Sequence, residues 1–340
     1  MNKKIIFISS LLFFYSSISS PVNARIKPDW VESEAVRYPN NLYISATGSA
    51  SDAELAKDRA LANLSKIFEV RIDAASTSKS DIYVSLHNMK ETVAKKNHLS
   101  QLIRVSANKV IQGAQVVESW RDDQLAMFYA LAVLDRKQAR NNIMDEINRL
   151  DEATNTQLEN IKLSKDPLLI IRGLDKAISL QQNRLSLHDT LKIINLHGRG
   201  YPGEWQLSSL QAQLEGELSL LRISAAVDTG KVSNSTELQK ILKTSMANAG
   251  FPAVDEGDYT FTLSLSINDL GFQYGWYWKR AKLNIAFAKS GGQIIEQKEW
   301  PLKVSSLQQE EAQSRLMTQV SNKLNVNIRS LIIGATSANN

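Results

Sequence analysis

The sequence predicts an α+β protein in which two α/β sandwich-like domains are joined by a helical connector. Each half of the 340-residue chain contains two kinds of pattern. In some stretches apolar and polar residues alternate, as in strands, and in others apolar residues recur every three or four positions, as in helices. The stretch between them is polar and mostly has helical spacing. We therefore expect a signal peptide over 1–24, an α+β domain over 28–150, a connector over 151–217 and a βαβββα domain over 218–334.

The first domain opens with a strand from Leu42 to Thr47, a Gly-containing turn, and a helix capped by Ser51 or Asp52. Five apolar residues of this helix share one face and should be buried: Leu55, Ala56, Ala60, Leu64 and Ile67.

A second helical region follows over 82–111, and then two strands from Ala114 to Trp120 and from Leu125 to Leu134. The polar stretch 121–124 between the strands predicts a hairpin turn, and a helix over 136–150 completes the domain. Trp30 and Trp120 are expected to pack into this domain, because large aromatic side chains are mostly buried.

Three stretches of this domain resemble the LPP20 domain of bacterial envelope proteins: Pro28-Asp29-Trp30, Leu42 to Gly48, and Val116 to Ala139. The resemblance covers roughly 28–150 and implies a small α+β domain associated with flagellar or cell-surface assemblies, without enzyme activity. Family members are commonly lipoproteins. Here Arg25 stands where the lipidated cysteine would follow the cleavage site, so we expect no lipidation.

The connector should hold three helices. Asp166-Pro167 is a favourable cap and first turn for a helix that continues through Leu169, Ile171, Leu174 and Ile178. A second helix through Leu187, Leu191 and Ile194 ends at the Gly-rich turn 197–203. A short third helix carries Trp205, Leu207, Leu210 and Leu214.

In the last domain the strands are expected over 218–227, 259–267, 282–288 and 294–304, and the helices over 235–249 and 308–333. This order of elements is similar to that of the N-terminal domain of the translocation protein TolB and of penicillin-binding-protein activator lipoproteins.

The first 24 residues have the pattern of a cleaved secretory signal peptide. Lys3 and Lys4 precede an apolar run that is too short to span a membrane, and small residues flank Asn23. Its removal takes away two lysines and no acids, which lowers the net charge from +5 to +3. Cysteine is absent. We expect a periplasmic protein without a later membrane span, and association with the outer membrane is left open.

No motif for catalysis or cofactor binding stands out. The four histidines are scattered, with no spacing suited to a metal, and the glycines form neither a phosphate-binding loop nor a nucleophile elbow. The basic residues are interspersed with acids, which argues against nucleic acid as a partner. We expect no enzyme activity, no catalytic residue, no cofactor and no metal.

The stretch GFQYGWYWKR at 271–280 is the candidate partner-binding site. Up to Ile267 the odd-numbered residues are apolar, whereas the aromatic residues that follow are mostly even, so a turn, bulge or kink must lie across 268–271. The aromatic residues then either complete the core or form an exposed hairpin tip. In the second case the binding residues are Phe272, Tyr274, Trp276, Tyr277, Trp278 and Arg280.

Together these observations predict a non-enzymatic periplasmic assembly or scaffold protein whose partners are envelope proteins or a peptidoglycan-associated complex. One alternative is a flagellar basal-body ring component at the outer membrane, since the flagellar T-ring protein family resembles the same pair of domains. Another is an activator or binder of peptidoglycan-synthesis machinery. The partner and any self-association are left open.

Overall fold

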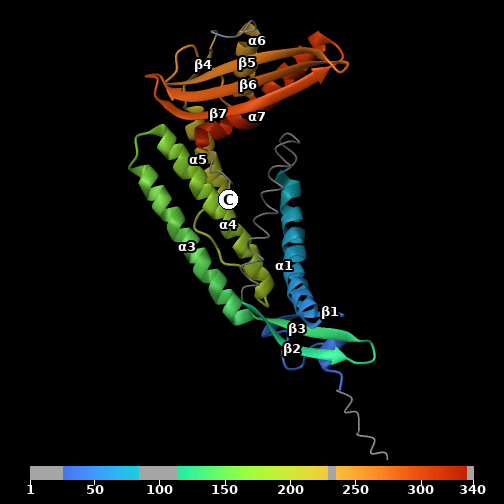
Figure 1. Cartoon of the computed structure of the whole chain (residues 1–340). Coiled ribbons are helices and arrows are strands. Elements are labelled where there is room, and N and C mark those ends of the chain that lie inside the picture. The colour runs from blue at the N-terminus through green and yellow to red at the C-terminus, as the bar shows by residue number, and fades with distance from the viewer. Residues whose placement is uncertain (1–25, 84–112, 229–234, 335–340) are drawn as a thin grey trace, which may run out of the picture. The chain divides into compact units, whose positions relative to one another are not determined.

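A computed structural model describes residues 26–83, 113–228 and 235–334 and contains both helices and sheets, as predicted (Figure 1). The chain divides into two compact units, which we describe one at a time. The signal peptide and nearly all of the helical region expected over 82–111 lie outside the described residues.

The first unit is a three-stranded sheet with the first turns of a long helix on one face. Its strands are arranged β1-β3-β2, and the element bounds are β1 Tyr43–Ala50, α1 Ala53–Tyr83, β2 Ala114–Asp122 and β3 Met127–Asp135. Helix and sheet meet through buried alanines, Ala56 and Ala60 against Ala130 and Ala132. A Cβ at Gly48 would lie 2.2 Å from the backbone nitrogen of Ala60, so this close approach requires a glycine.

The opposite face of this sheet is covered by the chain that precedes β1. Trp30, in the 3-10 turn Asp29–Val31, is only 3% exposed and packs with Leu131 and Val133. Its indole N–H donates to Glu118 Oε2 at 2.6 Å, which satisfies the polar atom. The packing expected of Trp30 is confirmed. Trp120 is half-buried beside Tyr129, with ring centroids 5.5 Å apart.

The connector helices are longer than the sequence predicts, and fewer breaks separate them. Their bounds are α3 Arg136–Lys162, α4 Pro167–Ile194 and α5 Leu207–Ser219. The predicted cap of α4 is present, since Asp166 accepts a backbone N–H bond there. Asp135, which the sequence analysis did not single out, accepts backbone N–H bonds at the start of α3.

Three expectations about this region are wrong. The two helices expected from 167 to 194 form one continuous helix. The polar residues in its middle are buried and bond to other side chains, so no turn interrupts the helix. Leu169 is 57% exposed, and Leu168 takes the buried position instead. Leu218 belongs to α5 rather than to a strand, and it is buried there. The expected domain limits at 150 and 217 both fall inside helices, and the domain division stays a prediction.

The C-terminal elements form a four-stranded sheet with the predicted βαβββα order. Their bounds are β4 Ile223–Val227, α6 Ser235–Asn248, β5 Tyr259–Gln273, β6 Trp276–Lys289, β7 Ile294–Ser306 and α7 Gln309–Ile333. The strands lie in the order β4-β5-β6-β7, with β4 parallel to β5 and the other pairs antiparallel. Both α6 and α7 pack on one face, behind the sheet in the view of Figure 1.

Side-chain alternation gives this sheet one buried and one open face. On β6 the odd-numbered residues from Ala281 to Phe287 are buried against the helices, and their even-numbered neighbours lie on the open face. Strand β7 forms one edge of the sheet. Pro301 within it lacks a backbone donor, and Lys298, paired with Ile285, puts a charge on the helix-covered side.

Candidate partner-binding site

The β5–β6 hairpin contains the register change that the sequence predicts, in the form of a bulge. Asp269 pairs with Lys279 and Gly271 pairs with Trp278, so Leu270 is an extra residue on β5. Gly271 has a φ of 68°, a conformation that glycine adopts at little cost, and its N–H donates to Asp269 Oδ1 at 3.0 Å. The glycine at position 271 and the acceptor side chain of Asp269 therefore both stabilise the bulge.

The hairpin closes at a two-residue turn formed by Tyr274 and Gly275. Their φ angles are 53° and 82°, and positive values at both central residues are those of a type I′ turn. Asn-Gly is the favoured pair for this turn, since a bulky residue at positive φ costs of order 1 kcal/mol. Tyr274 at this position therefore lowers the stability of the turn relative to asparagine. Its side chain is 95% exposed.

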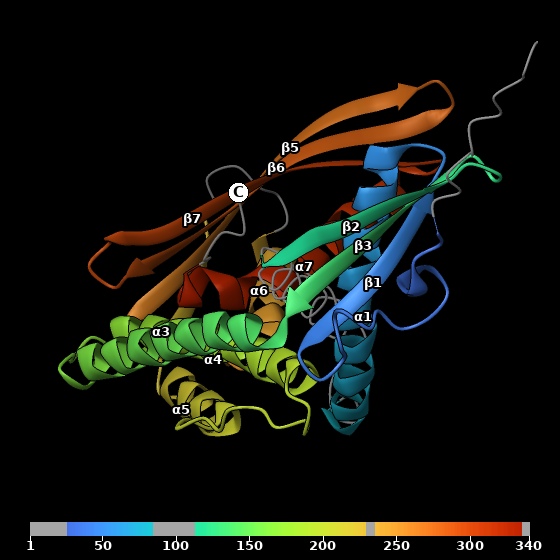
Figure 2. The same cartoon turned by 90° about the horizontal axis from the view of Figure 1, so that it is seen from below.

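The aromatic side chains of the hairpin point in more than one direction and differ in exposure. Large parts of Phe272, Tyr274 and Trp276 are exposed, at 61%, 95% and 39%. Tyr277 and Trp278 are half-buried and Arg280 is exposed. The six candidate residues belong to one end of the β5–β6 hairpin, and none of them is buried. The tip of this hairpin is at the upper right of Figure 2.

The even-numbered aromatic residues do not all lie on one face. The extra residue in the bulge moves Phe272 across the strand, opposite Tyr277, and their ring centroids are 5.0 Å apart. These two lie on the helix side of the hairpin. Trp276 and Trp278 lie on the open face, since they alternate with Tyr277 along β6.

An ion pair anchors the base of the tip. Lys279 is 6% exposed, and its ammonium group donates to Asp269 Oδ2 at 2.5 Å. This hydrogen bond, followed by the one from the Gly271 N–H, holds the pKa of the Asp269 carboxyl below its ordinary value. The sequence analysis gave no role to this pair. The sequence contains one sign of this pair: Lys279 occupies a strand position whose neighbours on the same face are buried.

Trp278 is held in place from two sides. Its indole N–H donates to the carbonyl oxygen of Gln273 at 3.2 Å, across the hairpin. From the neighbouring strand, Lys303 Nζ lies 4.4 Å from the ring centroid, within the range of a cation–π contact. These two contacts therefore fix the position of the Trp278 ring.

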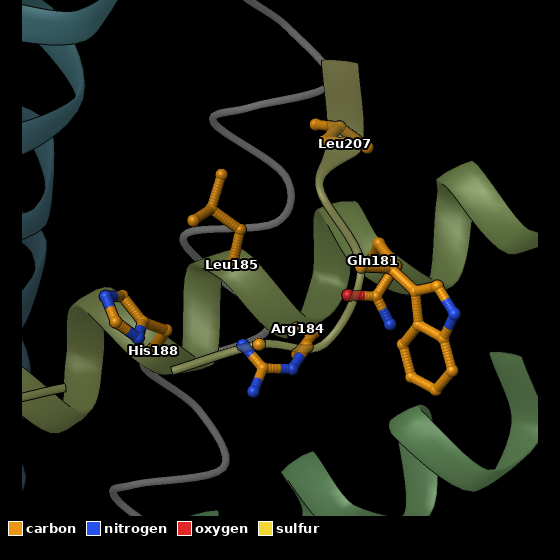
Figure 3. A pocket seen from close by; sticks show the side chains of 7 residues that line it. Gln181, Arg184, Leu185, His188 and Leu207 are labelled. Atoms are coloured by element: carbon orange, nitrogen blue, oxygen red, sulfur yellow. The ribbon is translucent and has the colours of Figure 1, made fainter. Parts of the chain in front are cut away.

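A second polar cluster lies on α4, where an extended segment that follows the helix passes over its side chains (Figure 3). Arg184, 5% exposed, donates through Nε to both carboxylate oxygens of Asp151 at 2.7 and 3.0 Å. Its Nη2 donates to the Pro202 carbonyl at 2.7 Å. A Cβ at Gly203 would lie 2.9 Å from Arg184 Nη1, so the segment can lie this close because it carries a glycine there.

His188 belongs to the same cluster. Its Nδ1 lies 2.7 Å from the Tyr201 carbonyl oxygen, which can only accept, so Nδ1 carries the proton. Burial lowers the pKa of this imidazole. Gln181, Arg184, His188 and Trp205 line a small open pocket of about 160 Å³. The Arg184 guanidinium group bonds to groups of the protein itself. We therefore interpret this cluster as structural: it holds the segment that follows α4 against that helix.

Among the residues that the structure describes, no group of acidic or histidine side chains is arranged to hold a metal ion. Nor does any helix in the described ranges have the length and apolar character needed to cross a membrane.

No protein-family model and no curated protein matches the sequence, so the LPP20-like and TolB-like resemblances have no family match behind them. Among solved structures, the secreted protein HP1454 from Helicobacter pylori is 14% identical over 86% of this chain and 98% of that chain, with a TM-score of 0.42. A minor lipoprotein from Acinetobacter baumannii is 11% identical over 32% of this chain and 92% of that chain, with a TM-score of 0.26. These likenesses are too distant to carry a functional argument.

Proposed function

We propose that this chain is a non-enzymatic protein of the bacterial envelope that acts as an assembly or scaffold factor and binds a protein partner through the β5–β6 tip. The N-terminal export pattern supports the location. One observation carries the binding role: Tyr274, almost fully exposed, occupies a turn position that a smaller polar residue would fill at lower cost. Backbone strain of this kind is often retained where a side chain serves a function.

The surroundings of Tyr274 support the same role. Exposed Phe272 and Trp276 stand beside it, and ring contacts and hydrogen bonds limit the movement of Tyr277 and Trp278. Tyrosine, tryptophan and arginine dominate the binding energy of protein interfaces. Side chains that are already ordered lose less conformational entropy on binding. The tip thus combines the composition and the rigidity that suit a protein partner.

The substitution Tyr274→Asn separates binding from folding. It gives the turn its favoured Asn-Gly sequence, so the free energy of unfolding should stay the same or rise by up to about 1 kcal/mol. It also removes the most exposed aromatic ring, so partner binding should fall. Val326→Ala is the matched control, because it removes an apolar side chain that is 70% exposed on α7, away from the tip.

Binding is measured in intact cells by cross-linking from a photoreactive phenylalanine analogue placed at position 272. We expect a cross-linked protein that Tyr274→Asn reduces at least several-fold and Val326→Ala leaves unchanged. Equal yields in both variants, or no cross-linked protein, would refute the proposal. A captured flagellar basal-body protein would support the ring-component alternative, and a captured peptidoglycan synthase the wall-synthesis alternative.

A further inference from the structure

Two cations face each other on the open face of the sheet, directly behind the aromatic tip. Arg280 on β6 and Lys303 on β7 are register partners. Among the described residues, neither lies within ion-pair distance of a carboxylate, and both are exposed. Other lysines of the same hairpin differ in this respect, since Lys279 pairs with Asp269 and Lys282 pairs with Glu299 at 3.3 Å.

This arrangement costs stability and leaves charge unneutralised. Like charges directly opposite one another on antiparallel strands repel. The aliphatic stem of Lys303 and its contact with the Trp278 ring offset part of that cost, whereas Arg280 makes no hydrogen bond or ion pair with the described residues. A guanidinium group presents a planar fork that matches a carboxylate. The face therefore offers a site for anions, bordered by two tryptophans.

We propose that the partner segment that contacts this face is an acidic protein segment, in which one carboxylate pairs with Arg280, another pairs with Lys303, and an apolar side chain packs on Trp276 and Trp278. This inference rests on the proposed function and names the chemistry of the partner. It follows from charge complementarity, since an anionic segment would relieve the repulsion between the two cations.

An anionic membrane surface would offer the same charge, but the geometry favours a protein. Lipid-binding clusters usually carry about four to eight basic residues, and this face has two that lack an acidic partner. The aromatic side chains also leave the hairpin on both faces, with Phe272 and Tyr277 on the helix side. A groove in a partner protein can enclose both faces of such a tip, whereas a flat interface contacts one.

The test uses the full chain with the photoreactive analogue at position 276, which lies on the same open face as Arg280. The cross-linked peptide is identified by mass spectrometry and synthesised, and its Kd is measured for the unlabelled chain and for three variants: Arg280→Gln with Lys303→Gln, Tyr274→Asn, and Lys282→Gln. The last is the matched control, because it removes the same charge from the same face two residues away, where Glu299 already pairs with it.

We expect a peptide with at least two acidic residues. The double charge variant should raise the Kd about tenfold at 0.1 M salt and flatten its salt dependence, while Lys282→Gln changes it less than twofold. A peptide without acidic residues, or an unchanged Kd in the double variant, would overturn this inference and leave the proposed function standing. If neither position 272 nor position 276 yields a cross-linked protein and the chain instead binds vesicles of phosphatidylethanolamine and phosphatidylglycerol, both proposals fail.

Discussion

Replacing Asp151 by alanine should destabilise the connector far more than removing an exposed acid from the same helix. The substitution leaves the Arg184 guanidinium charged and 5% exposed, with backbone carbonyls as its remaining partners. Breaking a buried ion pair from one side costs about 3–5 kcal/mol. Because the Asp151 side chain is 22% exposed, water can replace part of its role, and we expect the lower end, about 3 kcal/mol.

The assay is urea unfolding, together with limited proteolysis of the segment 196–206 that passes over Arg184. Glu159→Gln is the control, since it removes an acid from an ion pair on α3 that is more than half exposed and should cost less than about 0.5 kcal/mol. The paired replacement Asp151→Leu with Arg184→Met should recover much of the loss, because it leaves no uncompensated charge. If Asp151→Ala costs no more than Glu159→Gln, the buried pair does not fasten this segment.

Three further outcomes are expected. Gly48→Ala should destabilise the first unit by about 3 kcal/mol, since its Cβ would overlap backbone of α1, whereas Gly216→Ala, with open space around it, should be neutral or slightly stabilising in the same thermal melt. The Asp269 carboxyl should titrate below 3.8 by NMR and return toward 3.8 in Lys279→Gln; its contribution to stability is present above that pH and lost as the pH falls through the folded-state pKa. His188, whose folded-state pKa is lowered, adds stability that is present above pH 6.5 and lost as the pH falls below it, so His188→Gln should show a smaller difference in unfolding free energy between pH 8 and pH 5.

The hairpin shows what a sequence reveals about such a site. The change from odd to even apolar positions after Ile267 is enough to predict an interruption, and the structure has a bulge there. The pattern does not say which residue is extra. That choice decides that Phe272 meets Tyr277, because a shift of one residue moves a side chain to the other face.

The connector shows what the sequence hides. Its middle reads Gln181-Gln182-Asn183-Arg184 and lies between the two helices that we expected there. Two of these side chains are buried instead, through bonds to residues of α3 about 30 positions earlier in the chain. Local propensity cannot anticipate a partner at that distance. The exposed Leu169 has the same origin, since the bundle, and not the helix alone, decides which stripe is buried.

The edge strand β7 has a consequence for how copies of this chain can meet. An unpaired strand edge is a template on which another sheet can grow, and a proline together with inward-facing charges makes that growth unfavourable. Pro301 and Lys298 provide both features. We therefore expect the sheet to end at β7 even at high protein concentration. Copies of this chain that met at this edge would then be held by side chains, which can be exchanged or regulated, and not by a continuous backbone ladder of the kind that makes fibres irreversible.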